Sequence, residues 1–94
     1  MCFARKADSF FRMRVHVLFF GPVAEALGLR EHWLELPSGA RIADCLDECQ
    51  RRWPALSAWR SRLHLSRNLE SAAEDSPLAE ADEIGLLPPV SGGA

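Results

Sequence analysis

Hydrophobic and polar residues along this chain follow two different periods. In residues 14–20 the period is two, with Val15, Val17 and Phe19 on one side of a predicted β-strand. The other side of that strand is also mostly apolar, so we expect a partner to cover it. In residues 41–53 apolar residues recur at helical spacing, which predicts an amphipathic helix. Its buried stripe consists of Ile42, Leu46, Cys49 and Trp53.

Acidic residues precede basic residues by four positions on the solvent side of this helix. Asp47 and Arg51 form one such pair, and Glu48 and Arg52 form the other. Pairs in this order stabilise a helix by a few tenths of a kcal/mol each. Pro54 then ends the helix, because proline cannot continue the hydrogen-bond ladder.

Shorter elements account for the rest of the chain. A short helix over residues 23–27 ends at Gly28, and residues 55–62 are expected to be irregular or to form one turn. Further strands are predicted over residues 31–36, 63–67, 70–73 and 83–87. In the last of these, Ile84 and Leu86 face the core and Leu87 faces out. This order predicts an α+β fold with a mixed sheet packed on one main helix.

The chain divides into three expected segments. Residues 1–12 form an N-terminal extension, either loose or preceding a true start at Met13, and residues 13–87 form one folded domain. Residues 88–94 form an extended C-terminal tail. Pro88 and Pro89 impose an extended backbone there, and the residues that follow have little to pack.

Composition and charge exclude several classes of protein. Eleven Lys and Arg against thirteen Asp and Glu give a net charge of −2, which argues against nucleic acid as a partner. The longest apolar run is much shorter than the roughly 18 residues of a membrane span, so no membrane partner is expected. The three cysteines, Cys2, Cys45 and Cys49, are an odd number and favour a reducing, cytoplasmic setting.

Charge is unevenly distributed in the second half of the chain. Residues 51–67 contain five Arg and no acid, whereas residues 70–83 contain six acids and no base. Two interpretations remain open. The runs form two solvated faces, or they form two patches that each dock a complementary partner.

The sequence contains no catalytic or metal-binding motif. Glycine-rich phosphate loops are absent, and the spacing of Cys45 and Cys49 is not that of a zinc site. We expect both thiols to be packed and inert, the histidines at 16, 32 and 64 to lie on the surface or within the sheet, and the tryptophans at 33, 53 and 59 to pack in the core or at its edges. No metal site and no catalytic site of the chain's own are therefore predicted.

The tail is the most informative feature. Gly92 and Gly93 follow the stiff Pro88-Pro89 pair and form a tip without side chains, which can pass through a narrow channel. Fully extended, residues 88–93 reach about 20 Å. That length is enough to carry a terminal carboxylate into the active site of another protein.

Several of these residues together carry a resemblance to a known family. They are Val17-Leu18-Phe19-Phe20, Asn68, Pro77-Leu78, Asp82-Glu83 and the ending Pro88-Pro89-Val90-Ser91-Gly92-Gly93. From Met13 to Gly93 the chain resembles the MoaD-type sulfur carriers of the MoaD/ThiS ubiquitin-like family, which includes the small subunits of molybdopterin synthase. The resemblance implies a ubiquitin-like β-grasp fold with a flexible Gly-Gly tail.

The resemblance also implies a chemistry in which this chain is a sulfur-donating subunit rather than a catalyst. A ubiquitin-activating-like adenylyltransferase uses ATP to activate the last glycine, here Gly93 after removal of Ala94, and sulfur then gives a C-terminal thiocarboxylate. Gly92, Ser91, Val90, Pro89 and Pro88 present that group to the large synthase subunit, which forms the dithiolene of the molybdenum cofactor. This chain itself binds no cofactor.

The same resemblance places the interface with the large subunit at Phe20, Leu18 and Leu87. Strand alternation predicts that these side chains share one exposed face. Packing of the three beneath a loop is the alternative.

Two residues depart from the family pattern. Ala81 replaces a glycine before Asp82-Glu83, which predicts a different backbone shape in that turn. Ala94 follows Gly93 and has to be removed before activation. Two other functions remain open: a sulfur carrier for thiamine or cysteine biosynthesis, and a ubiquitin-like modifier or binding module without sulfur chemistry.

Overall fold

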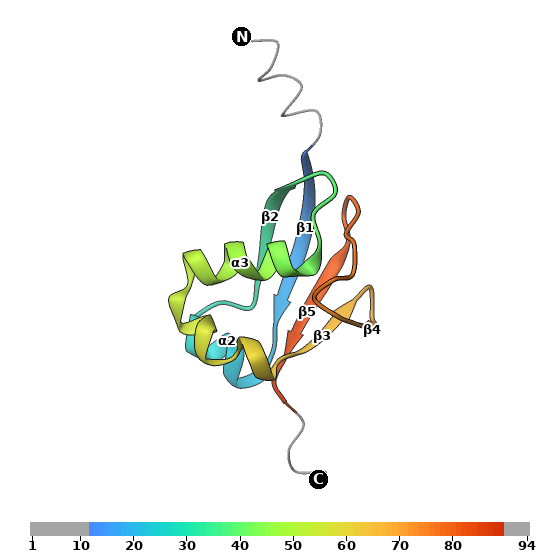
Figure 1. Cartoon of the computed structure of the whole chain (residues 1–94). Coiled ribbons are helices and arrows are strands. Elements are labelled where there is room, and N and C mark those ends of the chain that lie inside the picture. Colours follow the sequence, from blue (N-terminus) through green and yellow to red (C-terminus); the bar gives the residue numbers. More distant parts are fainter. Residues whose placement is uncertain (1–11, 90–94) are drawn as a thin grey trace.

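The computed structural model describes residues 12–89 (Figure 1). The expectations for residues 1–11 and 90–94, including Cys2, Val90, Ser91, Gly92, Gly93 and Ala94, lie outside the described residues. Within this range the strands are β1 (Arg12–Phe19), β2 (Glu31–Pro37), β3 (His64–Arg67), β4 (Glu70–Ala72) and β5 (Glu83–Leu87). The helices are α2 (Gly21–Leu27), α3 (Ile42–Arg52) and the 3-10 helices η1 (Pro54–Ala58) and η2 (Arg60–Arg62).

These strands form one mixed sheet in the order β2-β1-β5-β3-β4. At its centre β1 and β5 are parallel, with Val17 opposite Ile84. The pairs β1·β2, β5·β3 and β3·β4 are antiparallel. The first and last strands therefore lie side by side at the centre of the sheet. Because they are parallel, β1 begins and β5 ends at opposite ends of the domain (Figure 1).

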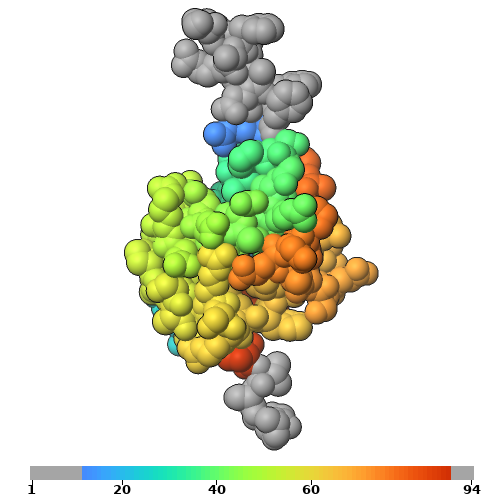
Figure 2. Space-filling model, viewed as in Figure 1, coloured from blue at the N-terminus to red at the C-terminus, as the bar shows by residue number. Residues whose placement is uncertain are grey.

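The core lies between the sheet and the helices. Val15, Val17 and Phe19 are buried on the helix side of β1, as the alternation predicted. Ile42, Leu46 and Cys49 of α3 are buried against them, and Trp53 packs at the margin of this core, so the predicted stripe is confirmed. Helix α3 crosses this face of the sheet, and in the space-filling view it and the segments after it cover that face (Figures 1 and 2).

Several boundaries differ from the sequence-based expectation. Strand β1 begins at Arg12 rather than residue 14, because Arg12 and Met13 pair with Pro37 and Leu36. It ends at Phe19, and Phe20 is the extended residue that precedes α2. Residues 54–62 form two 3-10 helices rather than an irregular stretch.

The predicted ion pairs of α3 are confirmed in one case and wrong in the other. Arg52 contacts Glu48 at 2.8 Å as expected. Arg51 also bonds Glu48 instead of Asp47, whereas Asp47 accepts from Nη1 of Arg60 at 2.6 Å. The helix begins where the Asp44 carboxylate accepts the backbone N–H of Arg41 at 2.8 Å.

The thiols and two of the tryptophans behave as the sequence indicates. Cys45 and Cys49 are fully buried, and a hydrogen bond with Cys49 together with burial raises the pKa of the Cys45 thiol. The prediction that both thiols are packed is confirmed, and their low reactivity stays a prediction. Trp53 and Trp59 pack partly buried against the core. The expectation is wrong for Trp33, which remains 46% exposed because its strand position points it away from the helices.

No helix within residues 12–89 is long and apolar enough to cross a membrane.

Candidate docking face and tail base

The base of the tail lies at the end of the central strand pair. Strand β5 ends at Leu87, and the partly buried Pro88 and Pro89 follow it. Pro88 lies against Gly21: a Cβ atom placed on Gly21 would come within 3.4 Å of the Pro88 ring. Gly21 also has φ +57°, a conformation that glycine adopts without strain. The start of α2 therefore fixes the point at which the chain leaves the domain.

The three residues predicted as an interface gather on the face of the sheet opposite the helices. Leu18 lies across from Gly85 in the β1·β5 register. A Cβ atom on Gly85 would lie 3.4 Å from both the Phe20 ring and the Leu87 side chain, so both cover this glycine. Phe20 is 41% exposed, and Leu18 and Leu87 are half-buried. We call Leu18, Phe20 and Leu87 the docking face.

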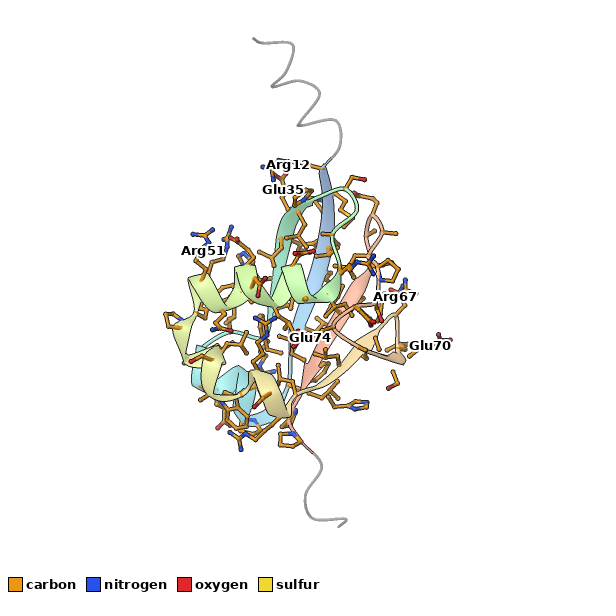
Figure 3. The ribbon with its side chains drawn as sticks, in the orientation of Figure 1. Arg12, Glu35, Arg51, Arg67, Glu70 and Glu74 are labelled. Carbon is orange, nitrogen blue, oxygen red and sulfur yellow. The ribbon has the colours of Figure 1, made fainter. Side chains whose placement is uncertain are left out.

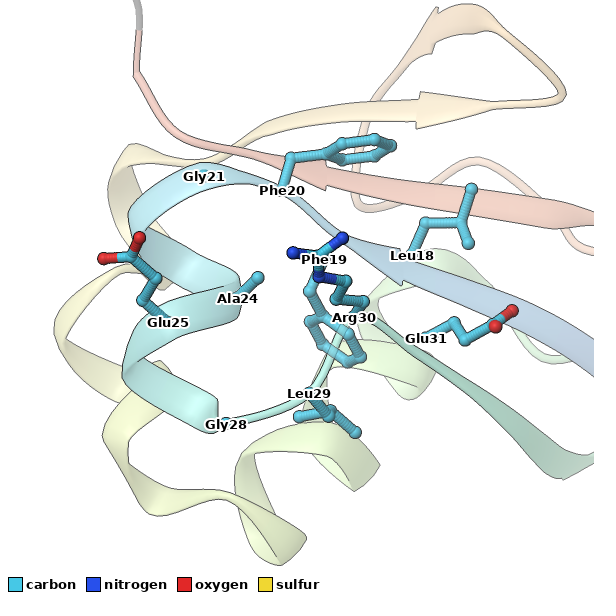
Figure 4. Close-up of a pocket in the computed structure, with 10 residues that line it drawn as sticks. All are labelled: Leu18, Phe19, Phe20, Gly21, Ala24, Glu25, Gly28, Leu29, Arg30 and Glu31. Carbon is cyan, nitrogen blue, oxygen red and sulfur yellow. The ribbon is translucent and has the colours of Figure 1, made fainter.

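A groove of about 630 Å³ adjoins the docking face (Figure 4). Leu18 and Phe20 form one side of it, and α2 with the α2–β2 loop forms the other. In Figure 4 the Phe20 ring projects over β5, whereas the Phe19 ring points the other way, toward the helices. The groove is therefore part of the surface around the tail base, with Glu25, Arg30 and Glu31 among its lining residues.

A second aromatic group lies on the same face and was missed by sequence reasoning. The rings of His16 and Trp33 stack at 4.5 Å with an interplanar angle of 5°. The Arg14 guanidinium lies 5.0 Å from the Trp33 ring centroid. Nε2 of His16 contacts a carboxylate oxygen of Glu31 at 2.6 Å. The alternation of residues 12–19 against 31–37 could have revealed this group, because both strands place these residues on the outer face.

Asp82 holds the start of β5 in place. Asp82 is buried, with 7% of the residue exposed. Its carboxylate accepts bonds from the Asn68 side chain at 2.9 Å, the Ala79 N–H at 2.8 Å and Arg67 at 3.2 Å. Burial by itself would raise the pKa of Asp82, but these bonds outweigh it and lower the pKa below its usual value. Asn68 also accepts the Glu83 N–H at 2.9 Å. Asn68, Asp82 and Glu83, quoted above for the resemblance, thus form one structural clamp.

The turn before this clamp has a backbone conformation that glycine adopts readily. Ala81 has φ +68°, in the left-handed region. The substitution of alanine for glycine was expected to change the shape of the turn. Instead, Ala81 accepts the strained conformation, and its N–H donates to the Arg14 carbonyl at 2.7 Å.

The basic and acidic runs pair with each other. Arg60 contacts Glu74 at 3.1 Å, and Arg67 contacts Asp82 at 3.2 Å. Figure 3 labels Arg67 of the basic run and Glu74 of the acidic run. These two contacts join residues 51–67 to residues 70–83, whereas Arg51 and Arg52 pair with Glu48 of α3, so only part of the charge of the two runs is paired between them. In the described part of the chain, no group of three potential metal-ligating side chains comes together.

Comparison with known proteins shows to which family the chain belongs. The model of the ThiS family matches residues 17–93, which includes the docking face, the clamp and both tail glycines. The chain belongs to the ThiS family.

Its relatives in this family include carriers and a modifier. It is 32% identical to the molybdopterin synthase sulfur carrier subunit of Arabidopsis thaliana, over 94% of this chain and 92% of the relative. It is 33% identical to small archaeal modifier protein 1 of Haloferax volcanii, over 79% and 94% of the two chains.

Solved structures agree with the family and the fold. The crystal structure of the Haloferax volcanii modifier superposes with a TM-score of 0.76 at 31% identity, covering 85% of this chain and 99% of the other. A complex of subunits 1 and 2 of the Helicobacter pylori molybdopterin-converting factor contains a chain that matches with a TM-score of 0.61 at 28% identity, over 86% and 100% of the two chains. The predicted α+β fold of the ubiquitin-like β-grasp type is confirmed.

Proposed function

We propose that this member of the ThiS family is the sulfur-carrying small subunit of a molybdopterin synthase, with Gly93 as the residue that carries sulfur. The observation that supports this most directly is the family match, which extends through Gly92 and Gly93 to residue 93. The Arabidopsis thaliana sulfur carrier subunit, similar over 94% of this chain, favours the same role.

The proposed reaction takes place on partner proteins. Hydrolysis of the Gly93–Ala94 peptide bond first frees the Gly93 carboxylate. One carboxylate oxygen attacks the α-phosphorus of ATP on a ubiquitin-activating-like adenylyltransferase, and pyrophosphate leaves. Hydrosulfide, the co-reactant, then attacks the activated carbonyl carbon, AMP leaves, the sulfur loses its proton, and the product is a thiocarboxylate. The chain contributes position rather than acid-base chemistry, since the activating partner holds the ATP.

The arrangement of the tail base supports delivery to a larger partner. The chain leaves the domain at Pro88, beside the docking face of Leu18, Phe20 and Leu87. A partner that covers this exposed apolar face receives the tail directly, and residues 88–93 reach about 20 Å into its active site when extended. We assign the large synthase subunit to this face. The Helicobacter pylori complex of two such subunits favours that assignment.

Intact mass spectrometry tests the proposal. A chain that ends at Gly93 is incubated with ATP, the adenylyltransferase of the source organism and a sulfur donor. We expect a mass gain equal to the difference between a sulfur and an oxygen atom. The same chain with Ala94 retained is the control and should gain nothing. A Gly93-terminated chain that never gains this mass contradicts the proposal.

Protein modification is the second candidate, favoured by the similarity to small archaeal modifier protein 1. In this case the activated Gly93 carbonyl forms an isopeptide bond with a lysine amine, and AMP leaves. Peptide mass mapping of conjugates isolated from cells detects this bond. Carriers of thiamine or cysteine biosynthesis share the activation step, so co-purification with a large synthase subunit separates them from the proposed role.

A further inference from the structure

We infer that the Ser66 hydroxyl is a specificity-determining hydrogen-bonding group inside the docking face, and that Gly85 sets its position. The inference rests on the proposed function, because it concerns the surface that we assign to the large synthase subunit. It adds a polar requirement to that surface: the partner has to present one uncharged hydrogen-bonding group among its apolar side chains.

Ser66 borders the docking face on the outer side of the sheet. In the β3·β5 register Ser66 lies opposite Gly85, and in the β1·β5 register Leu18 lies opposite the same glycine. Ser66 follows the buried Leu65, so strand alternation turns it away from the helices. Gly85 therefore has Leu18 on one side and Ser66 on the other, and the other two side chains of the docking face reach over it.

The lack of a side chain at Gly85 leaves room for the Ser66 hydroxyl. A Cβ atom on Gly85 would collide with Oγ of Ser66. The same Cβ atom would lie in ordinary contact, at 3.4 Å, with the nearest atoms of Phe20 and Leu87. The hydroxyl thus occupies the space that a methyl group at position 85 would fill, and it points into the docking face.

The Ser66 hydroxyl has no hydrogen-bond partner in the described part of the chain. None of the side-chain hydrogen bonds of residues 12–89 involves it. In the same residues no fully buried side-chain nitrogen or oxygen lacks a partner, so an oxygen without one is in contact with solvent. Solvent therefore satisfies this half-buried hydroxyl while the docking face is free.

A partner that covers the docking face removes this solvent. A hydroxyl that is desolvated without a replacement hydrogen bond weakens binding, so a well-fitting partner supplies one. Because a hydroxyl both donates and accepts, a backbone amide or an uncharged polar side chain can meet it. A charged group would be desolvated among apolar side chains. Glu31, which lies opposite Leu18 on β2, already contacts His16 at 2.6 Å.

This requirement gives specificity more than affinity. The apolar side chains of the docking face can pack against many apolar surfaces. A hydroxyl at a fixed position among them accepts only a surface with a polar group opposite it, because any other surface leaves the hydroxyl unpaired.

Calorimetry with the large molybdopterin synthase subunit of the source organism tests the inference. Ser66→Ala removes the hydroxyl and leaves the apolar side chains in place. We expect affinity to fall about fivefold or more, because the polar group of the partner loses its bond. The free energy of unfolding should not change, since the hydroxyl bonds nothing within residues 12–89. Ser71→Ala is the matched control: Ser71 lies opposite Ser66 on β4 and is exposed, so affinity should change by less than about twofold.

Gly85→Ala displaces the same hydroxyl by a second route. The added methyl group takes the place of the Ser66 oxygen but fits beside Phe20 and Leu87. We expect it to weaken binding by a factor similar to that of Ser66→Ala. In the Ser66→Ala background it should weaken binding no further, because no hydroxyl remains to be displaced. An equal loss in both backgrounds contradicts the role assigned to Gly85.

The outcomes separate this inference from the proposed function. If wild type binds the large subunit and Ser66→Ala binds equally well or more tightly, the inference is overturned and the proposed function stands. A loss in Ser71→Ala as large as that in Ser66→Ala also overturns it, because the position of the hydroxyl then has no importance. If wild type itself does not bind the large subunit, the proposed function fails and the inference fails with it.

Discussion

Asp82 is the only buried charged side chain among residues 12–89. Its three donors come from different segments: Asn68 and Arg67 from the β3–β4 hairpin, and Ala79 from the loop before β5. A buried carboxylate is favourable only when its oxygens are fully paired. These hydrogen bonds fix the point at which β5 begins. They therefore help to fix the register of β5, which is the strand that leads to the tail.

Replacing this carboxylate tests the clamp. We expect Asp82→Asn to lower the free energy of unfolding at pH 7 by about 2–3 kcal/mol, because the amide cannot accept all three bonds and adds donors of its own. Asp75→Asn, at an exposed position, should have little effect. Chemical denaturation of both variants measures the difference.

The difference in stability between wild type and Asp82→Asn should depend on pH. The folded-state pKa of Asp82 is lower than the unfolded value of about 3.9, so its contribution is complete above that unfolded pKa and is lost as pH falls through the folded pKa. The stability gap between wild type and Asp82→Asn should therefore be constant near neutral pH and shrink below about pH 4. A gap that widens in acid contradicts the assigned direction of the shift.

Three non-glycine residues adopt left-handed backbone conformations, and one of them is Asn68, a residue type that tolerates this region. Leu69 has φ +72° in the β3–β4 turn and Ala81 has φ +68° before β5. We expect Leu69→Gly and Ala81→Gly each to raise the free energy of unfolding by about 0.5–1 kcal/mol, because relief of strain exceeds the entropy lost by glycine. Leu69 is 88% exposed, so its replacement removes little packing.

The opposite substitution is the control for this effect. Gly39 has φ +92° with no atom within 4 Å of a Cβ position, so Gly39→Ala introduces only backbone strain. Thermal unfolding should show stabilisation for the first two variants and destabilisation for this one. A loss of stability in Leu69→Gly would mean that the turn is not strained.

At the scale of elements, periodicity identified every major strand and helix, because burial repeats every second residue in β1 and at helical spacing in α3. It failed where distant segments decide the outcome. Strand β1 begins at Arg12 because Leu36 and Pro37 lie beside it, and nothing local encodes that pairing. Likewise, Trp33 resembles a core residue in sequence and becomes exposed because no element covers the outer face.

Ion pairs between distant segments also could not be predicted from the sequence. Sequence proximity suggested that Asp47 pairs with Arg51, but Arg60 is the partner that the fold brings to Asp47. The predicted interface residues, Leu18, Phe20 and Leu87, could be placed on one face by alternation alone. Their gathering around Gly85 depends on the parallel pairing of β1 with β5, which places the first and the last strand side by side.

Arg60 connects three segments of the fold, so replacing it tests how these segments are held together. Hydrogen bonds from Arg60 to Glu74 and Asp47 join η2 to the β4–β5 loop and to α3, and they raise the pKa of Arg60. Its side chain is 22% exposed. We expect Arg60→Ala to lower the free energy of unfolding by about 1–2 kcal/mol.

Arg51 is the matched control, since its 71%-exposed side chain pairs only within α3. Arg51→Ala should cost less than about 0.5 kcal/mol. Urea denaturation in low and high salt compares the two variants. The Arg60 effect should persist better in salt, because the Arg60 side chain is itself less exposed than that of Arg51. Equal costs for the two substitutions would show that the Arg60 bonds do not link the elements.

At the scale of the whole molecule, the two faces of the sheet are used differently. The helices and the buried side chains lie on one face and account for stability (Figure 1). The other face carries the docking face and the stacked rings of His16 and Trp33, and the tail leaves from its margin. Stability and partner binding are therefore assigned to opposite sides of one sheet, so substitutions on one side need not disturb the other.

This separation predicts that the reactive end can be removed without cost to the fold. The core described here is complete between Met13 and Leu86, so deletion of residues 90–94 should leave the free energy of unfolding unchanged within error. Compared with a chain that ends at Gly93, the same deletion should abolish the proposed ATP-dependent activation, because the Gly93 carboxylate that attacks ATP is lost. Thermal unfolding and pyrophosphate release measure the two effects on one preparation. A deletion that destabilises the domain by more than about 1 kcal/mol would mean that the tail packs on it. In that case the tail would have to be released from the domain before any partner could use it, and activation would compete with folding.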